Sequence, residues 1–133
     1  MIYLDTSALA KLVVEEPESG ALARWLDDRR HEVLVTSVVT KVELVRAASR
    51  HSPGGKSAAL MLMAELALVP IDPSVIDTAW SLDPPALRSL DALHLASALS
   101  LNATGLTFVA YDHRLVAAAA SAGLMVEAPG IPA

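Results

Sequence analysis

Short apolar runs alternate with helix-forming segments along this chain, and that alternation constrains the fold more than any other feature. Strands that are apolar on both faces and separated by helices form parallel sheets covered by helices on both sides. We therefore expect an α/β protein with three layers, α/β/α, around a central, mainly parallel sheet of four to five strands. The expected strands are residues 1–4, 33–36, 68–71, 106–111 and 124–127.

The helices are predicted from apolar residues at three- and four-residue steps and from residues that begin or end helices. Thr36 or Ser37 is suited to cap a helix, and Gly123 is suited to end one. The sequence His-Ser-Pro-Gly-Gly at 51–55 is the clearest loop. We expect helices at residues 7–14, 17–30, 37–50, 57–67, 73–82, 89–102 and 112–122.

Size and composition favour one domain spanning residues 1–133, because this length can bury a core without disulfides, and cysteine is absent. The longest apolar stretch, residues 58–71, is broken by Glu65 and Pro70 and is shorter than the roughly 20 residues that a membrane-spanning helix needs. The N-terminus has neither a basic segment nor a small-residue cleavage site. We expect a cytoplasmic protein with no membrane segment.

The net charge of −5 argues against a protein that coats DNA nonspecifically. It does not exclude nucleic acid, because acidic residues that bind divalent cations make a site less negative than the formal charge implies. Only five aromatic residues are present, and Trp25 and Trp80 both fall in helical apolar patterns. A platform for base stacking is therefore not expected.

Four acidic residues are predicted to meet at one edge of the sheet. Asp5 follows the first strand, and Asp112 follows the strand at 106–111. Asp91 is near the start of its helix, and Glu43 lies about two turns into the helix after the second strand. Ligand sites of open α/β sheets lie outside the carboxyl ends of the strands, where helix amino ends also gather.

Such a group of carboxylates requires compensation. Two like charges about 4 Å apart cost roughly 4 kcal/mol at an effective dielectric constant near 20. A divalent cation supplies the compensation, and oxygen ligands without cysteine or paired histidines favour Mg²⁺ or Mn²⁺, as one or two ions. Because Mg²⁺ commonly binds phosphate oxygens as well, this site indicates phosphoryl chemistry.

Four segments occur in the order found in PIN-domain ribonucleases, and together the chain resembles the VapC-type toxins of toxin-antitoxin pairs. The resemblance implies a PIN-like fold and a metal-dependent endoribonuclease that cuts structured RNA, such as tRNA or rRNA, and inhibits translation and growth. It also implies a homodimer that assembles further with a cognate, VapB-like antitoxin. The segments are Met-Ile-Tyr-Leu-Asp-Thr-Ser-Ala-Leu at 1–9, Thr-Lys-Val-Glu-Leu at 40–44, Leu-Asp-Ala-Leu-His-Leu-Ala at 90–96 and Tyr-Asp-His-Arg-Leu at 111–115.

The resemblance also assigns roles to residues. The acidic quartet of the family, which is both catalytic and metal-binding, matches Asp5, Glu43, Asp91 and Asp112. Thr6 and Ser7 match supporting positions beside the metal. The chain departs from the family's pattern at Ala110, where relatives often carry Thr or Ser before Tyr-Asp.

The expected reaction is hydrolysis, with water as the nucleophile. It predicts a 5′-phosphate and a 3′-hydroxyl, whereas attack by the ribose 2′-hydroxyl would leave a cyclic phosphate and would call for a pair of histidines. His94 lies three residues after Asp91 and is displaced around the helix. We interpret it as a packing or hydrogen-bonding residue, with a role as general base as the alternative.

The apolar residues and the basic residues near these segments can each be interpreted in two ways. The apolar residues at 60–68 indicate either a thick core or an interface with a second copy or an antitoxin. Five basic residues are candidate contacts for RNA phosphates, with solvated surface as the alternative. They are Lys11, Lys41, Arg46, Arg88 and Arg114.

The acidic quartet has a structural alternative as well. Each Asp is suited to cap the helix behind it, and Glu43 is suited to pair with Arg46 on a solvated face. Other acids, in polar segments, are expected to face solvent: Glu15, Glu16, Glu18, Asp27 and Asp28.

Three other functions deserve comparison with the nuclease. A dehalogenase-type phosphatase needs a second acid at the position of Ser7, and a receiver domain needs an acidic pair after the first strand. Neither requirement is met. A noncatalytic PIN-like module that binds RNA or protein remains the main alternative.

Overall fold

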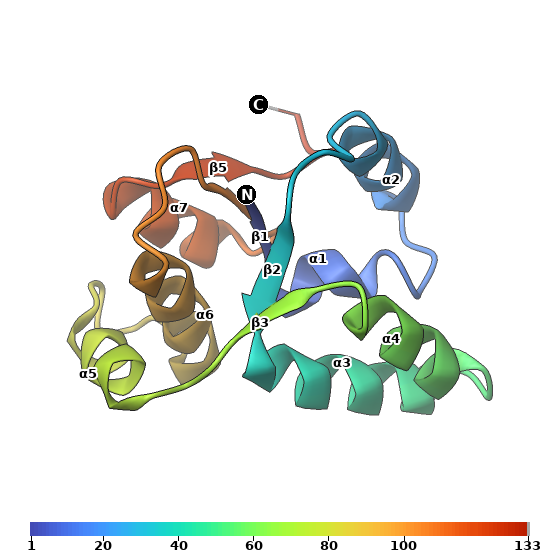
Figure 1. Cartoon of the computed structure of the whole chain (residues 1–133), viewed down its shortest axis with the longest axis horizontal. Helices are drawn as coiled ribbons and strands as arrows, with labels where there is room; N and C mark the ends of the chain where they lie inside the picture. The colour runs from blue at the N-terminus through green and yellow to red at the C-terminus, as the bar shows by residue number, and fades with distance from the viewer. Residues whose placement is uncertain (133) are drawn as a thin grey trace.

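Five parallel strands form the centre of the protein, whose computed structural model describes residues 1–132 (Figure 1). Every neighbouring pair is parallel, in the order β3-β2-β1-β4-β5. The predicted α/β class and parallel sheet are therefore confirmed. The strands are β1 (Ile2–Leu4), β2 (Leu34–Ser37), β3 (Ala67–Val69), β4 (Thr107–Val109) and β5 (Met125–Glu127).

Helices cover both faces of this sheet, which gives the three expected layers (Figure 1). The chain adds β2 and β3 on one side of β1 and then crosses back to add β4 and β5 on the other side. Because parallel crossovers are right-handed, this reversal puts α1 to α4 on one face and α5 to α7 on the opposite face. The helices are α1 (Thr6–Ala10), α2 (Ser19–Asp27), α3 (Val38–His51), α4 (Gly55–Met63), α5 (Pro73–Ser81), α6 (Ser89–Ser100) and α7 (His113–Ser121).

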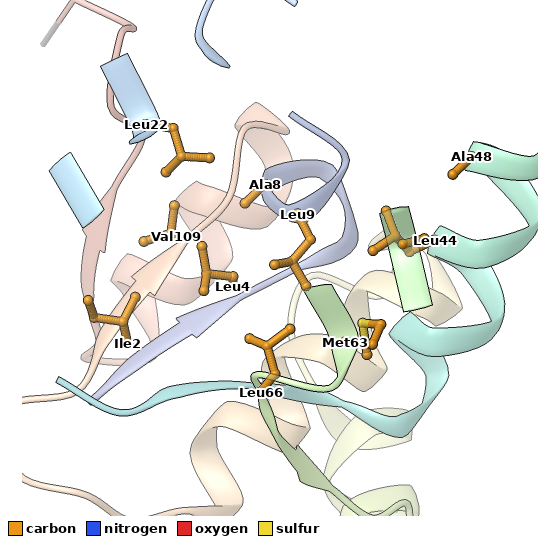
Figure 2. Close-up of a cluster of buried hydrophobic side chains, with 11 residues drawn as sticks. Ile2, Leu4, Ala8, Leu9, Leu22, Leu44, Ala48, Met63, Leu66 and Val109 are labelled. Carbon is orange, nitrogen blue, oxygen red and sulfur yellow. The ribbon is translucent and has the colours of Figure 1, made fainter. Parts of the chain in front are cut away.

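The strand β1 lies at the centre and divides the core by the alternation of its side chains. Ile2 and Leu4 enter the cluster under α1 to α4, whereas Tyr3 enters the cluster under α6 and α7. Figure 2 shows the first cluster, in which Leu9, Leu22 and other helical side chains point toward β1. All three β1 side chains are buried, so this strand and the loop after it are fixed from both faces.

Several element bounds differ from those expected, for local reasons. The third strand ends at Val69, because Pro70 has no N–H to donate to a sheet. The first helix ends at Ala10 instead of residue 14, and Leu12 and Val13 continue in tight turns. The helix expected at 57–67 ends at Met63, and the chain then turns into β3.

Two sets of apolar side chains are distributed differently from the expectation. Trp80 falls in a helical apolar pattern and lies on a helix, α5, yet the residue is 76% exposed. The apolar segment at 60–68 divides: Met63 and Leu66 are buried in the core, whereas Met61 and Leu68 are exposed. The thick-core reading is right for only part of that segment.

No helix within residues 1–132 has both the length and the apolar character to span a membrane.

The junction between α3 and α4 depends on close contact at Gly55. A Cβ atom at this position would lie 1.9 Å from the carbonyl oxygen of Ala48, which is backbone and has no rotamer to change. The neighbouring Gly54 has no atom within 4 Å of such a Cβ.

We expect Gly55→Ala to lower the free energy of unfolding by more than about 2 kcal/mol, because α4 must move away from α3 to admit one methyl group. Gly54→Ala should change it by less than about 0.5 kcal/mol and serves as the matched control. Urea denaturation followed by circular dichroism measures both values. Equal stability of the two variants would contradict this account of the junction.

Candidate active site at the carboxyl edge of the sheet

The carboxyl ends of β1 and β4 bring two of the predicted acids to the same edge. Asp5 follows β1 and is the N-cap of α1, and Asp112 follows β4 and is the N-cap of α7. The two strands are hydrogen-bonded neighbours, with Leu4 opposite Val109. Since the chain changes direction in the sheet at β1, this is the position where an α/β sheet opens a crevice for ligands.

Asp5 is the buried member of the site, with 3% of its surface exposed. Its Oδ1 accepts hydrogen bonds from the Ser7 hydroxyl (2.7 Å) and the Ala8 N–H (3.0 Å). Burial raises the pKa of Asp5; the Ser7 bond opposes that rise, and the negative charge of Asp91 adds to it. The Asp5 carboxylate is therefore costly to ionise where it lies.

Asp91 lies in the first turn of α6, half-buried, and interacts electrostatically with the other three acids. Burial raises its pKa, and the charge of Asp112 raises it further, with a smaller contribution from Glu43. His94 and Arg88 act in the opposite direction and lower it. Asp91 and Asp112 also line one hollow, so these two acids share a site, and the meeting of all four at one edge stays a prediction.

The capping reading of the aspartates is correct for two of them, and it does not compete with a role in the site. Asp112 is exposed, and its Oδ1 accepts from the N–H groups of Arg114 (3.0 Å) and Leu115 (3.1 Å). Asp5 also caps through Oδ1. Within residues 1–132 the Oδ2 atoms of both have no hydrogen-bond partner, so capping leaves one oxygen of each available.

Glu43 is held by two donors on a single oxygen. The Thr6 hydroxyl donates to Glu43 Oε1 at 2.7 Å, and His94 Nε2 lies 3.0 Å from the same atom. Burial alone would raise the pKa of Glu43, but the hydrogen bonds from His94 and Thr6 outweigh burial, and the pKa is lowered. Glu43 is thus an ionised carboxylate with a fixed orientation, and the alternative pairing with Arg46 does not occur.

His94 does not fit the role of general base. It is buried on α6, with Nδ1 2.9 Å from the Tyr3 hydroxyl and Nε2 at Glu43. Both ring nitrogens are occupied inside the protein, as the hydrogen-bonding interpretation expected. The sequence did not identify Tyr3 as the partner of His94. It showed only that His94 lies three residues after Asp91 on the same predicted helix.

Ser7 supplies polar support that Ala110 lacks. The Tyr111 N–H donates to Ser7 Oγ at 3.2 Å, and Ser7 Oγ donates to Asp5. Ala110 itself is buried, and its N–H donates to the carbonyl of Glu127 at 3.3 Å. The loop after β4 is therefore tied to the Asp5 loop through a serine.

Two of the five candidate basic residues line the site. A hollow of about 300 Å³ contains Arg88 and Arg114 beside Asp91 and Asp112, with Leu87 and His113 completing its wall. Arg88 and Arg114 are both exposed. Lys41 and Arg46 are exposed on α3 and do not line this hollow.

Lys11 is a correction to the predicted phosphate contacts. Its side chain is 7% exposed, and its ammonium group pairs with Glu18 at 2.7 Å and with Glu16 at 3.4 Å. It also lies 4.4 Å from the centre of the Tyr111 ring. Lys11 therefore joins α1 to the start of α2 and has no free charge for RNA, and Glu16 and Glu18 are not the fully solvated acids that were expected.

The donor set fits a hard divalent cation. The four acids offer oxygen atoms only, and the pKa of Asp5 and of Asp91 is raised, which is the state that a cation at the site would relieve. Within residues 1–132 no three carboxylate or imidazole groups lie close enough to form a compact ion-binding cluster. The mutual repulsion of carboxylates favours such separation.

The raised pKa of Asp91 makes stability depend on pH in a defined direction. The folded protein holds this proton more tightly than the unfolded chain, so the associated stability is present below the ordinary carboxyl pKa and is lost as pH rises through the folded-state pKa. The Asp91→Asn substitution removes this loss of stability at high pH. In EDTA at pH 7.5 we expect the variant to melt a few degrees above the parent, with the difference shrinking toward pH 4.

Thermal denaturation followed by circular dichroism across this pH range tests the expectation. Glu15→Gln, at an exposed acid outside the site, is the control and should leave the melting temperature nearly unchanged. A lower melting temperature for Asp91→Asn at pH 7.5, or a difference that does not vary with pH, would contradict the electrostatic account.

Comparisons with known proteins identify the family of the chain and agree with its fold. A model of the PIN domain matches residues 2–121. Ribonuclease VapC35 of Mycobacterium tuberculosis is 48% identical over 132 residues, covering 98% of each chain. The crystal structure of M. tuberculosis VapC20, described as a sarcin-ricin loop cleaving toxin, matches with a TM-score of 0.73 at 20% identity, over 97% of this chain and 100% of that one.

A further fold match comes from a complex. The structure of VapBC2 from Rickettsia felis, bound to a DNA fragment from its promoter, has a TM-score of 0.76 at 16% identity and covers 97% of this chain and 99% of its counterpart. The matches to solved structures concern the fold, and the family rests on the domain model and on the similarity to VapC35. The chain belongs to the PIN-domain family, among the VapC proteins.

Proposed function

We propose that this protein is a Mg²⁺- or Mn²⁺-dependent endoribonuclease, the toxin of a toxin-antitoxin pair, which hydrolyses phosphodiester bonds in structured RNA such as tRNA or rRNA. The observation that carries the proposal is the placement of Asp5 and Asp112 directly after the neighbouring strands β1 and β4, with Asp91 lining the same hollow as Asp112. The ribonuclease name of VapC35 supports it. Cleavage of translation RNAs in the cytoplasm would inhibit translation and growth.

The carboxylates of Asp5, Asp91, Asp112 and Glu43 would hold one or two ions. A bound divalent ion would supply Lewis acidity toward the scissile phosphate and lower the pKa of a water nucleophile. Ser7 orients the Asp5 carboxylate, and Thr6 orients that of Glu43. The two caps fix the backbone around Asp5 and Asp112, so three of the four carboxylates have hydrogen-bonded support before substrate binds.

Arg88 and Arg114 would bind RNA phosphates at the entrance. They share a hollow with Asp91 and Asp112, so a phosphate group near the acids would also contact one or both guanidinium groups. Recognition would depend mainly on backbone and shape, because no Phe, Tyr or Trp lines this hollow. Lys41 and Arg46 would at most contact more distant phosphates.

A second copy and an antitoxin would cover apolar surface that the fold leaves exposed. We propose a homodimer that assembles further with a VapB-like antitoxin, because several large apolar side chains on α3, α4 and α5 face outward. The VapBC2 complex, which has the same fold, supports an antitoxin partner. The exposed side chains are Val38, Val42, Leu60, Met61, Ile76 and Trp80.

RNA cleavage tests the reaction. We expect Asp5→Asn and Asp91→Asn each to reduce Mn²⁺-dependent cleavage by at least about 100-fold, because each removes an ionised carboxylate from the site while Asn keeps the shape. Sequencing of RNA ends after induction should give 5′-phosphate and 3′-hydroxyl products. Cleavage by either variant at the parental rate, cleavage in EDTA, or cyclic phosphate ends would contradict the mechanism, and Glu15→Gln controls for lost charge.

Growth tests the toxin role. Expression of the chain in a bacterium should arrest growth within a few generations, and co-expression of the cognate antitoxin should restore it. The Asp91→Asn variant should be harmless at the same soluble level. Normal growth with abundant soluble parent protein would instead favour the noncatalytic binding module.

A further inference from the structure

A buried chain of polar groups connects the centre of the sheet to the candidate site. The hydroxyl of Tyr3, on β1, lies 2.9 Å from His94 Nδ1, and His94 Nε2 lies 3.0 Å from Glu43 Oε1. Tyr3 is fully buried, and His94 is 2% exposed. Thr6 contacts both His94 and Glu43: its hydroxyl donates to Glu43 Oε1 at 2.7 Å and lies 3.2 Å from His94 Nε2.

The direction of the hydrogen bonds follows from counting protons. The single hydroxyl proton of Thr6 is used on Glu43, so His94 Nε2 must donate to Thr6 and Glu43 and not accept from them. A neutral imidazole that is protonated on Nε2 has an unprotonated Nδ1, which accepts the hydroxyl proton of Tyr3. In the neutral ring, the Tyr3 hydroxyl therefore fixes the tautomer in which His94 donates to Glu43.

We propose that His94 is a positioning residue that acts through Glu43: the Tyr3–His94 pair and Thr6 hold Glu43 Oε1 and leave Oε2 as the oxygen presented to the metal. Within residues 1–132 Oε2 accepts no hydrogen bond. A glutamate on an exposed helix samples several rotamers, and two donors on one oxygen remove that freedom before an ion arrives. The metal part of this inference rests on the proposed function, whereas the orientation of Glu43 does not.

A merely structural histidine is the alternative reading, and two amide substitutions separate it from the positioning role. The side-chain amide of Gln reaches the place of Nε2 and retains a donor for Glu43. The amide of Asn reaches only the place of Nδ1 and retains the contact with Tyr3. Both variants lose the ring, so a packing role predicts similar effects for the two. The positioning role predicts different effects.

The experiment combines NMR of the protein without metal and titration with Mn²⁺. In the parent protein, the ¹⁵N shifts of His94 should identify Nε2 as protonated and Nδ1 as unprotonated. Calorimetric Mn²⁺ titration should show about a tenfold or larger loss of affinity for His94→Asn and a loss below about threefold for His94→Gln. Ser100→Ala, at an exposed hydroxyl near the end of the same helix and outside the polar chain, should retain parental affinity.

Tyr3→Phe provides the second variant, because Phe keeps the stacking on Phe108 at 5.3 Å between ring centres and loses only the hydroxyl. In Tyr3→Phe, the ¹⁵N chemical shifts of His94 should move toward those of a mixture of tautomers, and the Mn²⁺ affinity of the variant should fall severalfold. This measurement decides the question even where His94 variants fold poorly, since it leaves the ring in place.

Each outcome has a definite meaning. Protonation of His94 on Nδ1 in the parent, or equal Mn²⁺ affinities for His94→Asn and His94→Gln, would overturn the positioning role. A parent that shows the Nε2 tautomer and binds no Mn²⁺ would refute the proposed metal site while supporting the orientation of Glu43 by His94. Failure of this inference and failure of the proposed function are thus distinguishable.

Discussion

The parallel pairing of β1 with both β2 and β4 is the constraint on which the candidate site depends. It puts the carboxyl end of the most deeply buried strand beside that of the strand that precedes Asp112. Asp5 can remain buried at this point only because α1 begins there and supplies the Ala8 N–H. The same reversal of the chain that divides the helices between two faces also puts the carboxyl ends of β1 and β4 side by side, where open α/β sheets bind ligands.

This arrangement stores unfavourable electrostatic energy at one edge of a well-packed protein. Burial and neighbouring charge act together on Asp5 and Asp91, whereas Glu43 is stabilised by its donors. The pKa values of Asp91 and Glu43 shift in opposite directions because the two residues lie on different helices with different neighbours. Asp91 is in the first turn of α6, where His94 and Arg88 oppose the rise in its pKa, and Glu43 lies in the middle of α3 opposite His94 and Thr6.

The sequence predicted the fold class and the placement of Asp5 and Asp112 directly after strands, because both depend on features that are regular along the chain. Strand burial appears as apolar runs, and a carboxyl end of a parallel strand is always at the same edge. The bounds of α1 and α4 were wrong, since a turn after Ala10 or Met63 depends on tertiary contacts and not on periodicity. Trp80 lies on a helix, as its spacing predicted, but periodicity alone did not show that the residue would be 76% exposed.

Side-chain partners were the least predictable part of the site. Lys11 precedes two acids by five and seven residues, a spacing that no single helix makes adjacent, and only the turn between α1 and α2 brings them together. The Tyr3–His94 contact joins residues 91 positions apart, on a strand and a helix of different crossovers. Such contacts follow from the packed structure, so a sequence alone gives no distance from which to infer them.

The aspartates illustrate why a residue type in a favourable position does not separate structural from chemical roles. A carboxylate has two oxygens, and a helix cap requires one of them. Asp5 and Asp112 both cap through Oδ1, which fixes the plane of the group and leaves Oδ2 for another partner. Glu43 achieves the same division through Oε1, with side-chain donors in place of backbone ones. Under the proposed function, hydrogen bonding that satisfies one oxygen of each group would direct the other oxygen toward an ion, so the stabilising and chemical readings describe the two oxygens of one group.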